Sequence, residues 1–205
     1  MQHFVTISGN IGAGKTNLSK ILSEKLNWSL APEPVDENPY LKNFYQDMKK
    51  WAFHSQVFYL SKMVEYHHSL SKREVSSIQD RSVYENAEIF AKNLYNQGQM
   101  SFDEWETYQL LYKSLLLRAN PPDLLIYLKA TPEFLMERIQ ERSREAERNI
   151  SFQYIQQLNT LYNDWIINFT LCPILILDLA GTDFKNRPKE QDEIVEKMFS
   201  VIKNS

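Results

Sequence analysis

The sequence predicts an α/β fold of three layers, with a parallel five-stranded sheet flanked on both faces by helices. Short apolar runs alternate with long amphipathic segments along the chain of 205 residues. The runs 124–128 and 174–177 are apolar throughout, which is typical of parallel strands that are covered on both faces. No linker or repeat divides the chain. We therefore expect a single domain over residues 1–205.

The elements follow from apolar periodicity and from helix start signals. Ser101 and Glu104 form a capping-box pattern, Thr131 is an N-cap before Pro132, and Pro188 opens the last helix. Strands are expected at 3–8, 28–32, 75–80, 123–129 and 173–179. Helices are expected near 15–26, 38–70 (in two pieces), 82–97, 101–119, 131–142, 151–170 and 188–203. In such a fold the site lies at the carboxyl ends of the strands.

Composition narrows the partners. The net charge is −3, so nothing in the charge favours nucleic acid or a membrane surface as a partner. The lone cysteine, Cys172, cannot form an internal disulfide and is expected in the core. No signal-peptide pattern and no apolar run of membrane-spanning length is present. We expect a cytoplasmic protein.

Three of the five glycines crowd into the turn after the first expected strand. The run from Gly9 to Thr16 matches G-x-x-x-x-G-K-[ST], a loop whose backbone N–H groups cradle phosphates. Lys15 would reach the β- and γ-phosphates, and the Thr16 hydroxyl would bind Mg²⁺. The alternative is a glycine turn before a helix that carries a surface lysine. The expected nucleotide-binding residues are Gly9, Asn10, Ile11, Gly12, Ala13, Gly14, Lys15 and Thr16.

This loop identifies the phosphate donor and leaves the reaction open. A switch GTPase would need an N-K-x-D motif, which is absent, and a motor would need an acid-ending strand, of which 75–80 is a weak version. A kinase for nucleoside monophosphates would grip its acceptor with arginines, yet the chain has none before Arg73. A kinase with an uncharged acceptor remains.

The segment after the second expected strand suits a neutral ring that carries a hydroxyl group. Glu33 stands between Pro32 and Pro34, where its carboxylate would lie beside the phosphate loop. Roughly half of the aromatic residues in this segment would instead be core residues at helical spacing. The candidate contacts are Glu33, Tyr40, Tyr45, Trp51, Gln56 and Tyr59.

A cluster of arginines follows the fourth expected strand. Arg138 and Arg142 are four residues apart and share a helix face, and Arg144 and Arg148 follow. Such a run is often a solvated surface. Beside a phosphate loop, we expect a lid over about 140–150 that closes on the triphosphate.

Together these motifs resemble the deoxyribonucleoside kinase family, and bacterial deoxyadenosine kinases most of all. The resemblance covers nearly the whole chain. It implies a homodimer, Mg·ATP as the donor, and phosphorylation of a deoxyribonucleoside at its 5′-hydroxyl in nucleotide salvage. The alternatives are a nucleoside monophosphate kinase and a regulatory nucleotide-binding module without turnover. The matching motifs are 9–16, Glu33-Pro34-Val35, 51–56, Asp80-Arg81-Ser82-Val83-Tyr84, 138–147 and 154–162 with Trp165.

The resemblance also implies roles for residues. Catalysis would use Glu33 as the general base, with Arg81 and Lys15. Asp80 would lie near Mg²⁺, together with Thr16. The donor would contact Arg138, Arg142 and Arg144, and its adenine would contact Asp183 and Phe184. The substrate would meet Val35, the pair Tyr45 and Glu147 at the sugar 3′-hydroxyl, Gln56 at the base edge, and Phe90 stacked on the base.

The base preference depends on departures from the family pattern. Met63 and Asn86 stand where some members carry an Arg–Asp pair that faces the base, and Ser55 and Asn38 replace aromatic residues. The Gln56 amide can pair with the amine and ring nitrogen of adenine or cytosine. Guanine presents two acceptors and favours a forked donor such as arginine. We expect deoxyadenosine first and deoxycytidine second.

Overall fold

The computed structural model of the chain describes residues 2–35, 37–72, 75–117, 119–144, 147 and 150–204. Its five strands form one parallel sheet, as predicted, and their order in the sheet is β2-β3-β1-β4-β5. Their bounds are β1 Phe4–Gly9, β2 Ser29–Ala31, β3 Ser77–Asp80, β4 Leu124–Lys129 and β5 Ile174–Asp178. Strand β1 is central, and its neighbours β3 and β4 end beside it, so the residues that follow these strands converge.

Every expected helix is present. The segment 38–70 is two helices, as expected, and the segment 82–97 contains a π-helical turn between two short α-helices. The helices are α1 Lys15–Leu26, α2 Leu41–Gln46, α3 Met48–Ser71, α4 Val83–Glu85, the π-helix η1 Asn86–Ala91, α5 Lys92–Asn96, α6 Phe102–Leu116, α7 Pro132–Arg142, α8 Phe152–Asn168, the 3₁₀ turn η3 Leu179–Gly181 and α9 Pro188–Lys203.

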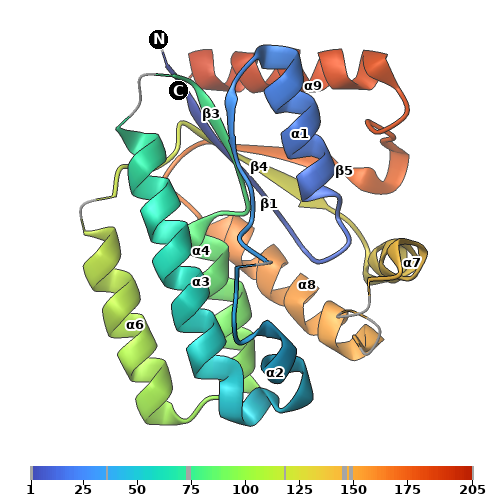
Figure 1. Ribbon diagram of the computed structural model, residues 1–205. Coiled ribbons are helices and arrows are strands. Elements are labelled where there is room, and N and C mark those ends of the chain that lie inside the picture. Colours follow the sequence, from blue (N-terminus) through green and yellow to red (C-terminus); the bar gives the residue numbers. More distant parts are fainter. Residues whose placement is uncertain are drawn as a thin grey trace.

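The helices cover both faces of the sheet (Figure 1). Helices α1 and α9 lie on one face, and α3, α4, α6 and α8 lie on the other. Alternate residues of β4 enter different cores: Leu124 and Ile126 pack with residues of α1 and α9, whereas Leu125 and Tyr127 pack with α8. This two-sided burial explains why the strand is apolar throughout.

Helix ends follow the start signals. The Ser101 capping box with Glu104 is formed, the Thr131 hydroxyl accepts from the Phe134 amide, and Pro188 lies in the first turn of α9. Cys172 is only half-buried at the edge of the α8 core, so the expectation of a core position is only partly met. In the described part of the chain, no helix has the length and apolar character needed to cross a membrane.

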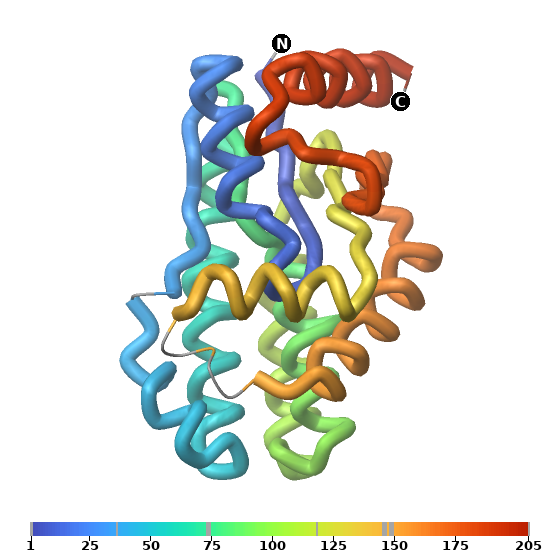
Figure 2. Tube along the Cα trace, turned by 90° about the vertical axis from the view of Figure 1, so that its right-hand side faces the viewer, coloured from blue at the N-terminus to red at the C-terminus, as the bar shows by residue number. Residues whose placement is uncertain are grey.

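Helix α7 runs across the loop between β1 and α1 (Figure 2). The backbone oxygen of Leu135 in α7 would lie 2.7 Å from a Cβ atom at position 12. A side chain at Gly12 would therefore force α7 away, and the φ of 87° at this residue also favours glycine. Glycine at position 12 thus allows α7, which carries Arg138 and Arg142, to lie close to the phosphate loop.

Candidate active site

The phosphate loop joins β1 to α1 and holds a buried lysine. The Lys15 Nζ donates hydrogen bonds to the backbone oxygens of Gly9 and Asn10, at 2.8 and 3.0 Å. Burial, followed by the nearby Arg81, lowers the pKa of Lys15 to about 8. The buried ammonium group of Lys15 is therefore destabilised when no anion is nearby, and a bound triphosphate would stabilise it.

Asp80 ends β3 beside the first turn of α1. Its Oδ2 accepts a hydrogen bond from the Thr16 hydroxyl at 2.6 Å, while its Oδ1 is buried with no hydrogen-bond partner among the described residues. Burial raises the pKa of this carboxyl group, and Glu33 raises it further. Asp80 therefore has an acceptor oxygen without a hydrogen-bond partner among the described residues. Among the described residues no cluster of three or more His, Cys, Asp or Glu side chains could hold a metal by itself.

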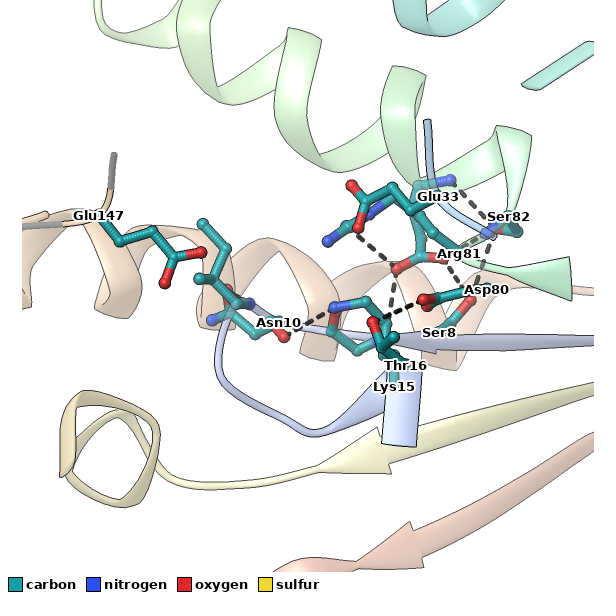
Figure 3. A network of polar contacts seen from close by, with 12 residues as sticks. Ser8, Asn10, Lys15, Thr16, Glu33, Asp80, Arg81, Ser82 and Glu147 are labelled. Carbon is teal, nitrogen blue, oxygen red and sulfur yellow. Dashed lines mark hydrogen bonds and ion pairs between the residues drawn. The ribbon is translucent and has the colours of Figure 1, made fainter. Parts of the chain in front are cut away.

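Arg81 follows β3, and its side chain reaches Glu33 (Figure 3). Its φ of 72° is left-handed, and its backbone N–H donates to the Ile7 oxygen. The Arg81 Nε donates to Glu33 Oε1 at 2.7 Å, and the guanidinium lies 4.4 Å from the Phe90 ring centre. Burial alone would lower the pKa of Arg81, but nearby carboxylates, Glu33 first, raise it well above its usual value. Arg81 is therefore a permanent cation that fixes the Glu33 carboxylate.

A second carboxylate behind Arg81 was not predicted. Glu85 is fully buried and accepts hydrogen bonds from the Ser8 hydroxyl at 2.6 Å, the Gly9 N–H at 3.1 Å and the Ser82 N–H at 2.7 Å. Its Oε1 lies 3.6 Å from Arg81 Nη1. Ser82 and Glu85 form a capping box, a pattern readable in the sequence. The contacts of Glu85 with β1 could not be predicted, because Ser8 lies 77 residues away along the chain.

Helix α8 supports the phosphate loop from the other side. The Tyr162 hydroxyl lies 2.7 Å from Glu85 Oε1 and 2.9 Å from the Gly9 oxygen, and it accepts a hydrogen bond from Arg81 Nη1 at 3.2 Å. The Asn10 side chain donates to the Ile155 oxygen, and the Asn159 side chain donates to the Ala130 oxygen at the end of β4. The sequence motif 154–162 marks this helix, but it does not predict that Tyr162 and Asn159 join the site.

Two cavities meet at the phosphate loop. The first, of about 330 Å³, lies between the loop, α7 and the segment after η3; we call it the donor cavity. The second, of about 300 Å³, lies between the loop, the segment after β2, α2, α3 and η1; we call it the acceptor cavity. Gly12, Gly14, Asn17 and Arg142 line both cavities. A group bound in one cavity is therefore adjacent to a group bound in the other.

The cavities gather most of the predicted site residues. The donor cavity is lined by Gly12, Ala13, Gly14, Arg138, Arg142, Asp183 and Phe184. The acceptor cavity is lined by Ile11, Gly12, Gly14, Lys15, Thr16, Glu33, Val35, Tyr45, Gln56, Arg81, Asn86, Phe90 and Glu147, and by Arg142 and Arg144. Arg144 thus lies at the acceptor cavity and not at the donor cavity where it was expected.

Four residues with a predicted binding or catalytic role line neither cavity, and the candidate contacts Tyr40 and Trp51, which stack on each other, also line neither. Gly9 and Asn10 lie at the root of the loop, and Asp80 lies behind Thr16. Met63, expected to face the base, is instead fully buried in the apolar core around α3 and α6 and also lies off the cavity walls. Arg148, which was part of the arginine cluster, lies outside the described residues, as do positions 145, 146 and 149 of the expected lid.

The far end of the acceptor cavity is made of amides and aromatic rings. Gln56 Oε1 and Asn86 Nδ2 are buried and have no hydrogen-bond partner among the described residues. The π-helical turn η1 carries both Asn86 and Phe90 into this wall. Burial, followed by Glu147, raises the pKa of Tyr45 to about 12, so this phenol stays protonated and can donate a hydrogen bond.

The geometry agrees with what the chain is similar to. The family model for deoxynucleoside kinases matches residues 5–203. The chain belongs to the deoxynucleoside kinase family. Its reaction is therefore the phosphorylation of a deoxynucleoside by a nucleoside triphosphate, and the fold and the enzyme class inferred from the sequence are confirmed.

Individual members of this family resemble the chain over most of its length. A deoxyadenosine/deoxycytidine kinase of Bacillus subtilis is 36% identical over 200 residues, which cover 97% of this chain and 92% of the relative. A deoxyguanosine kinase of the same organism is 34% identical over 163 residues, 78% of this chain and 76% of the relative. A solved deoxyadenosine kinase from M. mycoides, with the products dCMP and a flexible dCDP bound, has a TM-score of 0.85 and 30% identity. That likeness covers 97% of this chain and 100% of the M. mycoides chain.

Proposed function

We propose that this enzyme transfers the γ-phosphoryl group of ATP to the 5′-hydroxyl of a deoxyribonucleoside. The observation that carries the proposal is the Glu33–Arg81 pair at the wall of the acceptor cavity, beside Lys15 and the phosphate loop. A positioned carboxylate can accept a hydroxyl proton, whereas an acceptor that already carries a phosphate needs cations that are free to grip it. Arg81 and Arg142 are instead paired with carboxylates.

In this reaction the 5′-oxygen attacks the γ-phosphorus as its proton passes to Glu33. The bond between the γ-phosphorus and the bridging oxygen to the β-phosphate breaks, and ADP leaves. Arg81 holds Glu33 toward the hydroxyl. Lys15 and the loop N–H groups stabilise the charge that develops on the phosphoryl oxygens.

The proposal includes Mg²⁺, held by Thr16 and Asp80. The unpartnered, buried Oδ1 of Asp80 and the adjacent Thr16 hydroxyl fit such an ion, whose other ligands are commonly phosphates and water. When bound, Mg²⁺ would neutralise charge on the β- and γ-phosphates. Arg138, Asp183 and Phe184 would hold the donor, because they line the donor cavity. Residues 1–205 would act as one domain in the cytoplasm, where ATP is available, with 140–150 as a lid.

We further propose that deoxyadenosine is preferred and that deoxycytidine comes second. The amides of Gln56 and Asn86 suit an edge that has one donor and one acceptor, and no arginine lies among the residues of α3 and η1 that line the cavity. Similarity to a kinase named for deoxyadenosine and deoxycytidine supports this order. The deoxyguanosine kinases among the relatives make guanine the competitor to test.

The release of ADP separates this function from its alternatives. A coupled assay would compare the four deoxynucleosides, the matching 5′-monophosphates and a sample without acceptor, each with Mg·ATP. We expect turnover with deoxynucleosides alone. Turnover with monophosphates alone would indicate a monophosphate kinase, and no turnover with any acceptor, despite ATP binding, would indicate a regulatory module.

We also propose that the enzyme is a homodimer joined through α6. Large apolar side chains are exposed along this helix: Leu110 is 67% exposed, and Leu117, just after the end of the helix, is 83% exposed. A single chain has a mass of 24.3 kDa, so light scattering after gel filtration should give about twice that mass. Leu110→Glu should give the monomer, and the control Lys197→Glu on α9 should leave the dimer intact. A wild-type monomer would refute the proposal.

A further inference from the structure

The guanidinium of Arg142 grips a carboxylate of the acceptor cavity. Its Nη2 lies 2.6 Å from Glu147 Oε1, and its Nε donates to Glu147 Oε2 at 3.1 Å. Both oxygens of the carboxylate are therefore held by one planar fork, the geometry in which arginine fixes orientation as well as charge. Arg144 Nη1 is 3.7 Å from the same carboxylate and makes a looser contact.

Glu147 lies at the cavity end where a hydroxyl group would be bound. Its side chain is only 11% exposed although α7 ends five residues earlier, at Arg142. Tyr45 and Glu147 both line the acceptor cavity, and the negative charge of Glu147 adds to the effect of burial in raising the pKa of Tyr45. One group accepts a hydrogen bond and the other can donate one, so together they complement a substrate hydroxyl.

We propose that Arg142 is a positioning residue for the acceptor, which holds Glu147 in place for the 3′-hydroxyl of the sugar. This inference rests on the proposed function, and it adds a second role to the triphosphate contact that the sequence predicts for Arg142. Arg142 lines both cavities, so it lies where the proposed donor site meets the proposed sugar site. The fork to Glu147 turns it toward the sugar.

The neighbouring arginine of α7 provides a matched control. Arg138 lies one turn earlier on the same helix and lines only the donor cavity, where its guanidinium is 5.2 Å from the Phe134 ring centre. A lid arginine that serves the triphosphate alone should behave like Arg138. A residue that acts through Glu147 should affect only substrates that possess the 3′-hydroxyl.

The test is a cycle of variants and substrates. The kcat/KM at saturating Mg·ATP would be measured for deoxyadenosine and for 2′,3′-dideoxyadenosine, which lacks the 3′-hydroxyl. The proteins are the wild type, Arg142→Ala, Glu147→Gln and Arg138→Ala. For each variant, the loss with deoxyadenosine is divided by the loss with the dideoxy analogue. A folding defect lowers both rates equally and cancels in this ratio.

We expect a ratio of about tenfold for Arg142→Ala and for Glu147→Gln, because a hydrogen bond to a charged group is lost. We expect a ratio near one for Arg138→Ala. A ratio below about threefold for Arg142→Ala would overturn the inference. If Glu147→Gln alone gives a large ratio, the sugar contact of the proposed function stands and only the role of Arg142 fails. If the ratio for Glu147→Gln is also near one, the proposed sugar contact fails as well.

Discussion

Two buried cations, Lys15 and Arg81, lie among three carboxylates where β1 and β3 end. Glu33 and Glu85 interact with Arg81 from different sides, and Asp80 approaches Lys15 from the end of β3. Arg81 thus has a fully buried partner in Glu85 and a second partner, Glu33, that faces the acceptor cavity. This division of roles leaves Glu33 available for the proton of the substrate.

Replacing Glu33 with Gln should remove the base while keeping the shape of the side chain. We expect kcat to fall by about 10²–10⁴-fold, with little change in the binding of ATP, because a positioned general base has that effect. Steady-state kinetics with deoxyadenosine and calorimetry with a non-hydrolysable ATP analogue would measure the two effects. If kcat is retained and only the KM of the acceptor rises, Glu33 orients the substrate and is not the base.

The lowered pKa of Lys15 predicts how nucleotide affinity depends on pH. In the free enzyme Lys15 loses its proton near pH 8, whereas the triphosphate favours the charged ammonium group. Above pH 8, binding must therefore take up a proton, and the affinity for an ATP analogue should fall by up to about tenfold for each pH unit.

Calorimetry between pH 7 and 9.5 would measure this dependence. The variant Lys15→Ala serves as the control, since it should bind weakly and without the slope. A wild-type affinity that does not change across this range would show that Lys15 keeps its proton without the nucleotide.

Single residues also show how far the sequence can be interpreted. The phosphate loop and Glu33 were predictable, because a short local pattern defines each of them. Glu85 and Tyr162 were not, because their contacts join β1, α4 and α8 across long chain separations. Met63 was placed at the base by its position in a pattern, yet it packs into the apolar core.

Among the elements, α4 deserves a test because its one turn carries Glu85. The variant Glu85→Gln would remove a buried charge and weaken an acceptor for the Ser8 hydroxyl, the Gly9 N–H and the Ser82 N–H. We expect a loss of about 3 kcal/mol or more in the free energy of unfolding, since one partner of a buried charge network is removed. Denaturant unfolding would measure it, with Glu196→Gln, an exposed position on α9, as the control. A loss below 1 kcal/mol for Glu85→Gln would contradict the structural role.

We expect the end of α7 and the proposed lid to respond to nucleotide binding. Arg138 lines the donor cavity, so a bound triphosphate should order the end of α7 and the proposed lid. Amide exchange over 140–150 should slow when an ATP analogue binds, while exchange in α6 should not change. Equal exchange with and without the analogue would indicate a solvated helix end and not a lid.

Element boundaries were largely predictable, because caps and apolar periodicity are local. Thr131, Pro132 and the Ser101 box mark real helix starts. The π-helical turn of η1 was not predictable, since the segment 82–97 follows an ordinary helical pattern. This turn brings Asn86 and Phe90 to the same cavity wall, so the irregularity affects the site directly.

At the scale of the whole molecule, the parallel sheet explains why the two cavities adjoin. Strands β1 and β3 end side by side, with Ile7 opposite Asp80. The residues that follow these strands are the phosphate loop and Arg81, so the fold itself brings the donor to the acceptor. The alternation of strands and helices and the motifs predicted a site where the strands end, whereas the sharing of Arg142 between the cavities required the structure.

The most direct test of the account is a competition among acceptors. The wild-type enzyme would receive Mg·ATP with equal concentrations of deoxyadenosine, deoxycytidine, deoxyguanosine and thymidine, and early products would be identified by mass spectrometry. Products of such a mixture form in proportion to kcat/KM. We predict deoxyadenosine 5′-monophosphate first and deoxycytidine 5′-monophosphate second. Deoxyguanosine or thymidine monophosphate in first place would contradict the reading of Gln56 and Asn86, and the absence of any monophosphate would contradict the kinase itself.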